Sequence, residues 1–209
     1  MHHRYPQWGF ARCIALATLL AGAAAAQAAH TVYVYQSGPD VIAQGSGPIN
    51  TAGITLFGNT GNFIPDVQAN VGRIAIGTAA STQWQGISGP TSFGNGGQAF
   101  ATSVTGNFVG VVGVNNSIRL PNGYVSGAPL QNSARWNGRT LASLGLNVGT
   151  YTYTWGSGPT SDSLTLVIGS APPVAPSAPA TVPTLSQWGL ILLSLLLASF
   201  GGAMSRQRC

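Results

Sequence analysis

The chain contains neither lysine nor glutamate, and its only acidic side chains are Asp40, Asp66 and Asp162. Charged residues make up 5% of the sequence, against about a quarter in an average soluble domain. Helical bundles and coiled coils need charged residues along their solvent-facing sides, so these folds are excluded. Glycine accounts for 29 of the 209 residues. Glycine and asparagine clusters punctuate the chain between short apolar segments, which favours strands joined by turns.

The first 28 residues have the three parts of a secretory signal peptide. Arg4 and Arg12 precede an apolar run over 13–26. Ala26, Gln27 and Ala28 then have the small-x-small form of a cleavage site. As a helix this run spans only about 21 Å, short of a bilayer core of about 30 Å. We therefore expect export by Sec-type machinery and cleavage after Ala28, with a retained N-terminal anchor as the alternative.

A second apolar run, residues 188–204, lies near the C-terminus and is followed by a basic tail of Arg206 and Arg208. The run predicts a transmembrane helix, and the basic tail predicts a cytoplasmic C-terminus with the body outside. A buried helix of a soluble domain is the alternative. The preceding residues, 171–181, are rich in proline and alanine and predict an extended spacer.

A short motif precedes the second apolar run and consists of Val182, Pro183, Thr184, Leu185, Trp188 and Gly189. With the run and the basic tail, residues 182–209 resemble the IPTL-CTERM sorting signal, a relative of the PEP-CTERM signals of Gram-negative bacteria, with Val182 in place of the usual isoleucine. The resemblance implies processing by an exosortase-class membrane transpeptidase and a final location at the cell surface or in the extracellular matrix. The body resembles, more loosely, an uncharacterised ectodomain found before such signals, over residues 92–94, 123–130, 143–145, 149–158 and 161–166.

The body, residues 29–170, predicts a single all-β domain, either sandwich-like or barrel-like. Polar and apolar residues alternate at 150–155, and apolar residues recur at every second position in 163–168, so these two segments predict a hairpin. Residues 31–35 also predict a strand, and a helical turn is expected near 141–146. Further strands are expected at 48–57, 71–77, 98–105, 107–114 and 117–120. Between residues 30 and 170 there is no cysteine, so no internal disulfide is expected.

The body offers few groups for catalysis. Its one histidine, His30, lies next to the predicted mature N-terminus, where we expect a mobile residue and therefore no Ser-His-Asp triad. The three aspartates are far apart in sequence and predict no metal cluster, although a calcium site built with backbone carbonyls stays open. Four arginines against three aspartates give the body a formal charge of +1, without the basic stripe of a nucleic-acid-binding protein. We expect no enzyme activity, cofactor or nucleic-acid partner.

Three aromatic residues, Tyr151, Tyr153 and Trp155, share one face of a predicted strand. Such a row commonly fills the core of a small β domain, and it can alternatively stack against sugar rings as a glycan platform.

We expect a non-enzymatic surface or extracellular-matrix protein whose precursor is anchored in the membrane. The alternatives are a glycan-binding or adhesive module, with extracellular polysaccharide as its partner, and an enzyme of unfamiliar chemistry.

Overall fold

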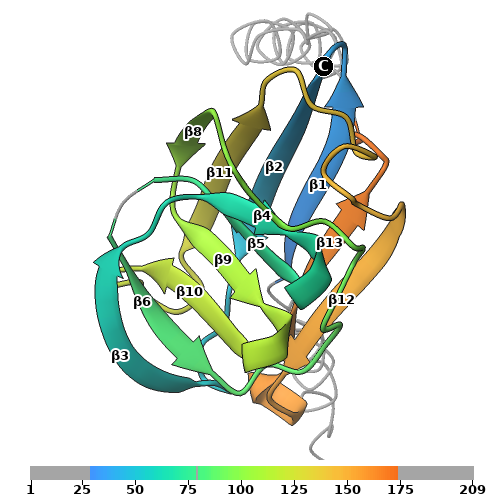
Figure 1. Cartoon of the computed structure of the whole chain (residues 1–209). Helices are drawn as coiled ribbons and strands as arrows, with labels where there is room; N and C mark the ends of the chain where they lie inside the picture. Colours follow the sequence, from blue (N-terminus) through green and yellow to red (C-terminus); the bar gives the residue numbers. More distant parts are fainter. Residues whose placement is uncertain (1–28, 79, 174–209) are drawn as a thin grey trace, which may run out of the picture. The chain divides into compact units, whose positions relative to one another are not determined.

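The computed structural model describes residues 29–78 and 80–173, and this part of the chain is built from strands and three short 3₁₀ helices (Figure 1). The strands are β1 (Ala29–Ser37), β2 (Asp40–Pro48), β3 (Thr55–Asn62), β4 (Asp66–Gln68), β5 (Arg73–Ile76), β6 (Ala80–Gln85), β7 (Gln98–Phe100), β8 (Ser103–Gly106), β9 (Val109–Val112), β10 (Ser117–Pro121), β11 (Pro129–Trp136), β12 (Gly149–Trp155) and β13 (Asp162–Ile168). The 3₁₀ helices are η1 (Ala69–Val71), η2 (Gly113–Asn115) and η3 (Gly158–Thr160).

The strands form two open sheets. The first sheet has the order β12-β13-β1-β2-β11-β8, and the second has the order β3-β6-β10-β9-β5-β4-β7. In the first sheet β1 pairs with β13 in parallel, from Ala29 opposite Ser163 to Val34 opposite Ile168. All other neighbouring strands of this sheet pair antiparallel. The first and last strands of the body therefore lie side by side in the middle of one sheet.

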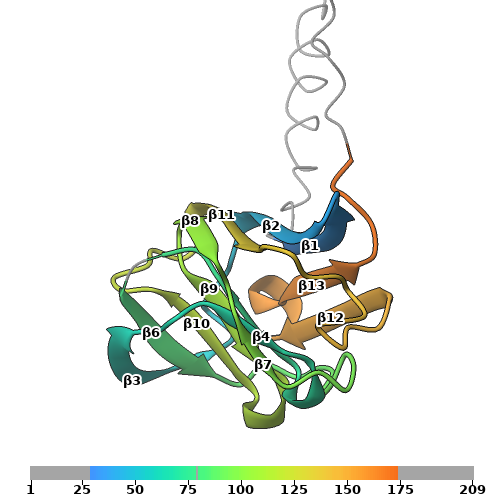
Figure 2. The same cartoon turned by 45° about the horizontal axis from the view of Figure 1, so that its top comes forward.

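One hydrophobic core lies between the two sheets, which the two views show as separate layers (Figures 1 and 2). Every second side chain of a strand contributes to this core, because successive side chains of a strand point to opposite faces. Val32 and Val34 of β1 are buried, while Tyr33 and Tyr35 between and after them are half-buried on the outer face. The second sheet contributes Ile74 and Ile76 from β5 and further residues from β9 and β10, including Val109, Val111, Ile118 and Leu120. Two open sheets around one core make a sandwich, so the prediction of an all-β fold is confirmed and the barrel-like alternative is wrong.

Several predicted elements agree with the structure in place but not in extent. The hairpin of 150–155 with 163–168 is confirmed as β12 and β13, which pair from Gly149 opposite Ile168 to Trp155 opposite Asp162. The predicted strand at 48–57 is wrong, because β2 ends at Pro48 and β3 begins at Thr55. Four strands were not predicted: β2, β4, β6 and β11.

Within residues 29–78 and 80–173, no helix combines the length and the apolar character needed to cross a membrane. The predicted signal peptide, most of the spacer and the predicted transmembrane segment at 188–204 lie outside the described residues.

Candidate functional site

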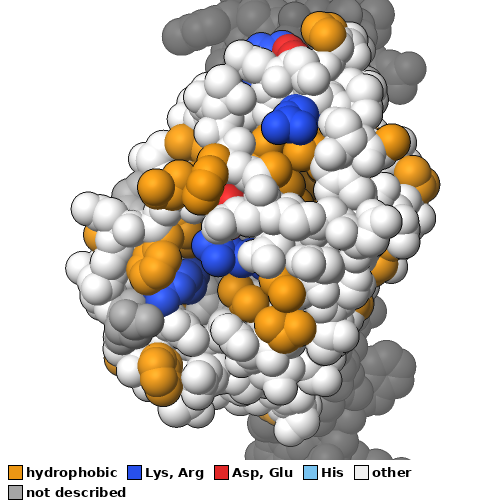
Figure 3. All heavy atoms as spheres, in the orientation of Figure 1, with side chains coloured by type: hydrophobic (Ala, Val, Ile, Leu, Met, Phe, Trp, Pro, Cys, Tyr) orange, Lys and Arg blue, Asp and Glu red, His pale blue; other side chains and the backbone are white. Residues whose placement is uncertain are grey.

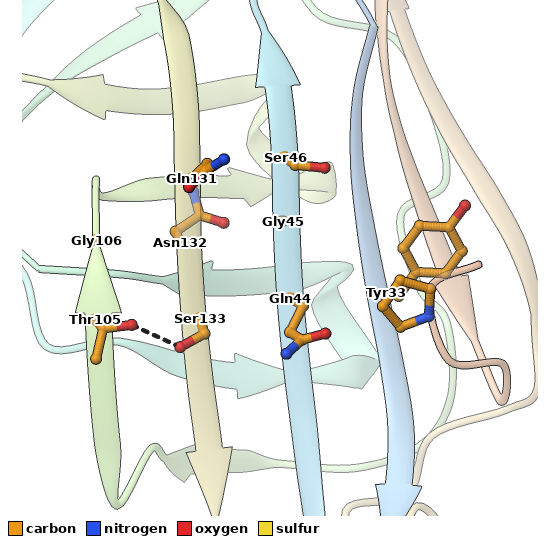
Figure 4. A pocket seen from close by; sticks show the side chains of 10 residues that line it. Tyr33, Gln44, Gly45, Ser46, Thr105, Gly106, Gln131, Asn132 and Ser133 are labelled. Carbon is orange, nitrogen blue, oxygen red and sulfur yellow. Dashed lines mark hydrogen bonds between the residues drawn. The ribbon is translucent and has the colours of Figure 1, made fainter. Parts of the chain in front are cut away.

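A polar hollow of about 450 Å³ lies on the outer face of the first sheet (Figure 4). Its lining residues come from β1, β2, β8 and β11 and from Pro172 beyond β13. They are Tyr33, Gln44, Gly45, Ser46, Thr105, Gly106, Gln131, Asn132, Ser133 and Pro172. None of these lining side chains is charged. The hollow can therefore offer hydrogen bonds and one tyrosine ring to a neutral ligand, but no ion pair.

The register of the first sheet arranges these side chains in rows. Ser133 lies opposite Gln44 on one side and Thr105 on the other, and Gln44 lies opposite Tyr33. Directly opposed residues of neighbouring strands point to the same face, so these four side chains form one row across the sheet. The Thr105 and Ser133 hydroxyl oxygens are 2.8 Å apart and share a hydrogen bond (Figure 4).

A second hollow, of about 190 Å³, lies on the outer face of the second sheet. Its lining residues include two arginines, Arg73 from β5 and Arg119 from β10. The others are Phe63, Ala75, Gln83, Phe108, Gly110, Val111, Val112, Asn115 and Ser117. In the space-filling view, blue arginine side chains lie next to one another over the strands of this sheet, with hydrophobic side chains beside them (Figure 3).

Arg73 is held by a buried carboxylate. Its Nε lies 2.9 Å from Oδ1 of Asp66, which has no exposed surface. The contact is an ion pair between the two side chains. The Gln98 amide donates to the other carboxylate oxygen. Burial raises the pKa of Asp66, and the Gln98 hydrogen bond and Arg73 oppose that rise.

Arg119 is held by an aromatic ring and an amide. Its guanidinium carbon lies 3.4 Å from the centre of the Phe63 ring, a cation–π contact. Its Nη2 donates to Gln83 Oε1 at 2.9 Å, across the β10–β6 pair. Burial lowers the pKa of Arg119, and the neighbouring positive charge of Arg73 lowers it further.

The expectation of a mobile His30 is wrong. His30 is fully buried in β1, on the core face, and its Nδ1 lies 2.8 Å from the Gly47 carbonyl, to which Nδ1–H donates. With the proton on Nδ1, Nε2 is an acceptor, and it has no hydrogen-bond partner among the described residues. The side-chain Oδ1 and Nδ2 atoms of the buried Asn132 also have no hydrogen-bond partner among these residues. Both groups converge over Gly45: a Cβ on that residue would lie 2.1 Å from Asn132 Oδ1 and 2.8 Å from His30 Nε2.

Two of the three residues in the predicted aromatic row of β12 lie in the core. Tyr153 is fully buried and Trp155 is 4% exposed, while Tyr151 is half-buried. The Tyr153 hydroxyl donates to the Gly72 carbonyl at 3.0 Å, and Trp155 Nε1 donates to the Asn50 carbonyl at 2.8 Å. The alternative of a glycan platform is therefore corrected for Tyr153 and Trp155, because rings enclosed between the sheets cannot stack on a sugar from solvent.

The three aspartates of the body are each engaged by an arginine or by backbone N–H groups, and they do not come together. Asp40 pairs with Arg135 at 2.8 Å. Asp66 pairs with Arg73, as described above. Asp162 accepts hydrogen bonds from the backbone N–H groups of Asn50 and Ser163. Among the described residues no group of three or more His, Cys, Asp or Glu side chains comes together.

The targeting residues that the sequence predicts lie outside the described part of the chain. They are Ala26, Gln27 and Ala28 of the cleavage site, Val182, Pro183, Thr184, Leu185, Trp188 and Gly189 of the motif, and Arg206 and Arg208 of the tail. Sequence reasoning missed the two outer hollows and the buried His30–Asn132 group. The sequence signal for the hollows is the set of polar residues at alternate, outward positions of each strand. This signal does not show which strands are neighbours, so it could not bring the lining residues together.

Comparison with known proteins identifies the C-terminal segment. Residues 180–208 match the family model described as the IPTL-CTERM motif, and this match contains the whole predicted motif and both arginines of the tail. None of the curated proteins and none of the solved structures matches this chain. The motif is typical of exported, membrane-associated surface proteins that an exosortase-type system processes. The chain is thus a protein with a C-terminal IPTL-CTERM sorting domain.

Proposed function

We propose that this protein is a non-enzymatic component of the cell surface or extracellular matrix. Sec-type machinery exports it, its C-terminal segment anchors the precursor, and an exosortase-class transpeptidase processes it. The observation that carries the proposal is the match of residues 180–208 to the sorting motif. The body is the part that remains outside, presented on the spacer.

The chemistry of the body supports a non-enzymatic role. The three carboxylates are engaged with Arg135, with Arg73 and with backbone N–H groups, and His30 is enclosed in the core. A general acid or base must reach the substrate directly or through one water molecule. Side chains that are buried or paired in this way serve the fold instead.

The processing step is tested by changing the motif without changing the hydrophobic run. The triple variant Pro183→Ala/Thr184→Ala/Leu185→Ala retains the run and the basic tail, which suffice for membrane insertion. An enzyme that reads side chains must lose its recognition site. We therefore expect the variant to accumulate as an unprocessed membrane precursor in a host with the cognate sorting enzyme.

A matched control places three alanines in the spacer, outside the matched segment: Pro176→Ala/Ser177→Ala/Pro179→Ala. This control should be processed and delivered like the parent. The measurement is the size and cell fraction of the product by immunoblot. Normal processing of the motif variant would show that the segment acts as a plain anchor.

A second candidate function is glycan binding on the exported body. The two outer hollows favour it, because both are lined by amide and hydroxyl side chains together with an aromatic ring. Such groups match the hydroxyl groups and the apolar faces of sugars. This candidate rests on the outer faces of the sheets and no longer on Tyr151, Tyr153 and Trp155.

A further inference from the structure

The hollow on the second sheet is created by small residues between two long ones. Across the sheet, Ala75 of β5 lies opposite Gly110 of β9, and Gly110 lies opposite Arg119 of β10. Arg73 lies two positions before Ala75 on the same face. Arg73 itself lies opposite Val112, one row along from Gly110, so the two arginines stand diagonally on either side of β9. Both arginines line the same hollow.

The charge at this hollow is positive toward solvent. Two guanidinium groups stand against one carboxylate, Asp66, which has no exposed surface. Arg73 also depresses the pKa of Arg119, so the two cations repel one another in the free protein. An anion placed between them would relieve this repulsion and gain charge-assisted hydrogen bonds.

Both arginines are held in place before any ligand arrives. Asp66, itself fixed by Gln98, positions Arg73 through its Nε. The Phe63 ring and the Gln83 amide position Arg119. Fixed side chains lose little conformational freedom on binding, so more of the interaction energy is available for affinity.

The surroundings fit a sugar ring that carries the anion. Asn115 and Ser117 line the hollow with groups that can bond to hydroxyls, and the volume suits one ring. Phe100, 55% exposed, lies opposite Asp66 in the β4–β7 pair and therefore on the same outer face. Its ring offers apolar area to a neighbouring sugar of a polymer.

From this arrangement we propose that the hollow of Arg73 and Arg119 binds the carboxylate of a uronic acid unit in an acidic polysaccharide. The inference deepens the second candidate function above and does not depend on sorting. Failure of sorting would be seen in product processing, whereas failure of this site would be seen in binding alone.

The test measures binding of a short oligogalacturonate to the full chain in uncharged detergent, at about 0.15 M salt, where long-range attraction between exposed charges is largely screened. Arg119→Gln should weaken binding roughly tenfold or more, because a hydrogen-bonded charge pair is lost. Arg119→Lys keeps the charge but loses the planar fork and the stacked geometry, so it should fall between parent and Arg119→Gln. The same oligomer with its carboxyl groups reduced to alcohols should not compete.

Arg139→Gln is the matched control, because it removes the same charge from an exposed side chain elsewhere. It should change affinity by about twofold or less, since a charge outside the site contributes only screened attraction. An equal effect of Arg139→Gln and Arg119→Gln would overturn the proposal in favour of non-specific attraction. Equal or tighter binding of polyphosphate, equally sensitive to Arg119→Gln, would overturn the uronate assignment and leave a general anion site. If Arg119→Gln does not fold, Phe63→Leu removes the ring that holds Arg119 and should still weaken binding; unchanged binding would refute the site.

Discussion

Replacing Tyr153 by phenylalanine tests the contribution of one hydrogen bond that crosses the core from the first sheet to the second. The Tyr153 ring comes from β12 of the first sheet and is fully buried, and its hydroxyl donates to the Gly72 carbonyl, directly before β5 of the second sheet, at 3.0 Å. Burial raises the pKa of Tyr153 far above its ordinary value of 10.0, so the hydroxyl stays protonated and remains a donor.

The expected cost is modest because the acceptor keeps a second partner. The Gly72 carbonyl also accepts from the Gly113 N–H at 2.9 Å, so it is not left unsatisfied when the hydroxyl is removed. The loss is then about 1 kcal/mol, the net value of one hydrogen bond, without the added penalty of an orphaned acceptor. Tyr153→Ala should cost about 3–5 kcal/mol, because it also empties the space of a buried ring.

The assay is thermal and urea unfolding of the body, residues 29–173, produced alone. In a domain of this size 1 kcal/mol lowers the Tm by roughly 2–4 °C. Tyr151→Phe is the matched control, because it removes the same atom from the same strand at an exposed hydrogen bond to the Asn147 carbonyl, and it should cost at most about 0.5 kcal/mol. Equal costs for the two phenylalanine variants, or a Tyr153→Ala cost under about 1 kcal/mol, would refute the placement of Tyr153 in the core.

Four further outcomes follow from the same features. The exported protein should begin at Ala29 on N-terminal sequencing, and a mature chain that retains Arg12 would contradict the signal peptide. The body alone should unfold cooperatively with a Tm that a chelator does not change, whereas a large shift would reveal a bound metal. Gly45→Ala should destabilise the body by about 1–3 kcal/mol in urea unfolding, because its Cβ would meet Asn132 and His30; a neutral result would contradict the close approach. Burial lowers the pKa of His30 below 6.5, so the unfolded chain binds more protons just below pH 6.5 and stability should fall as the pH drops through that value. His30→Gln should lose this part of the pH dependence relative to the parent; the opposite contributions of Asp66 and Asp162, whose pKa values burial raises, are common to both proteins, and identical pH profiles would refute the assignment.

Local pattern was enough for the elements that carry their own signal. Residues 150–155 alternate perfectly between threonine and aromatic side chains, and this alternation predicted both β12 and the burial of Tyr153 and Trp155. The C-terminal segment was recognisable for a different reason, because its motif, apolar run and basic tail are contiguous in sequence. Neither conclusion needed a contact between distant residues.

Local pattern failed where a distant partner decides the structure. The end of β2 reads Gly45-Ser46-Gly47-Pro48, which is turn chemistry, yet these residues are strand. A Cβ at Gly45 would collide with Asn132 of β11, and a Cβ at Gly47 would lie 2.3 Å from the Ala29 carbonyl. The glycines are there because neighbouring strands approach closely, and the residues that flank them in sequence do not reveal that approach.

The same limit applies to the candidate site. The sequence by itself determined that the chain carries a sorting motif, and that the body is a β domain with few charges. Only the tertiary structure decided that β1 pairs in parallel with β13, that His30 lies in the core, and that Arg73 and Arg119, 46 positions apart in sequence, face one hollow across Gly110. Strand order and register are set by the summed burial of two whole sheet faces, so residues far apart in sequence meet only once the sheets have formed.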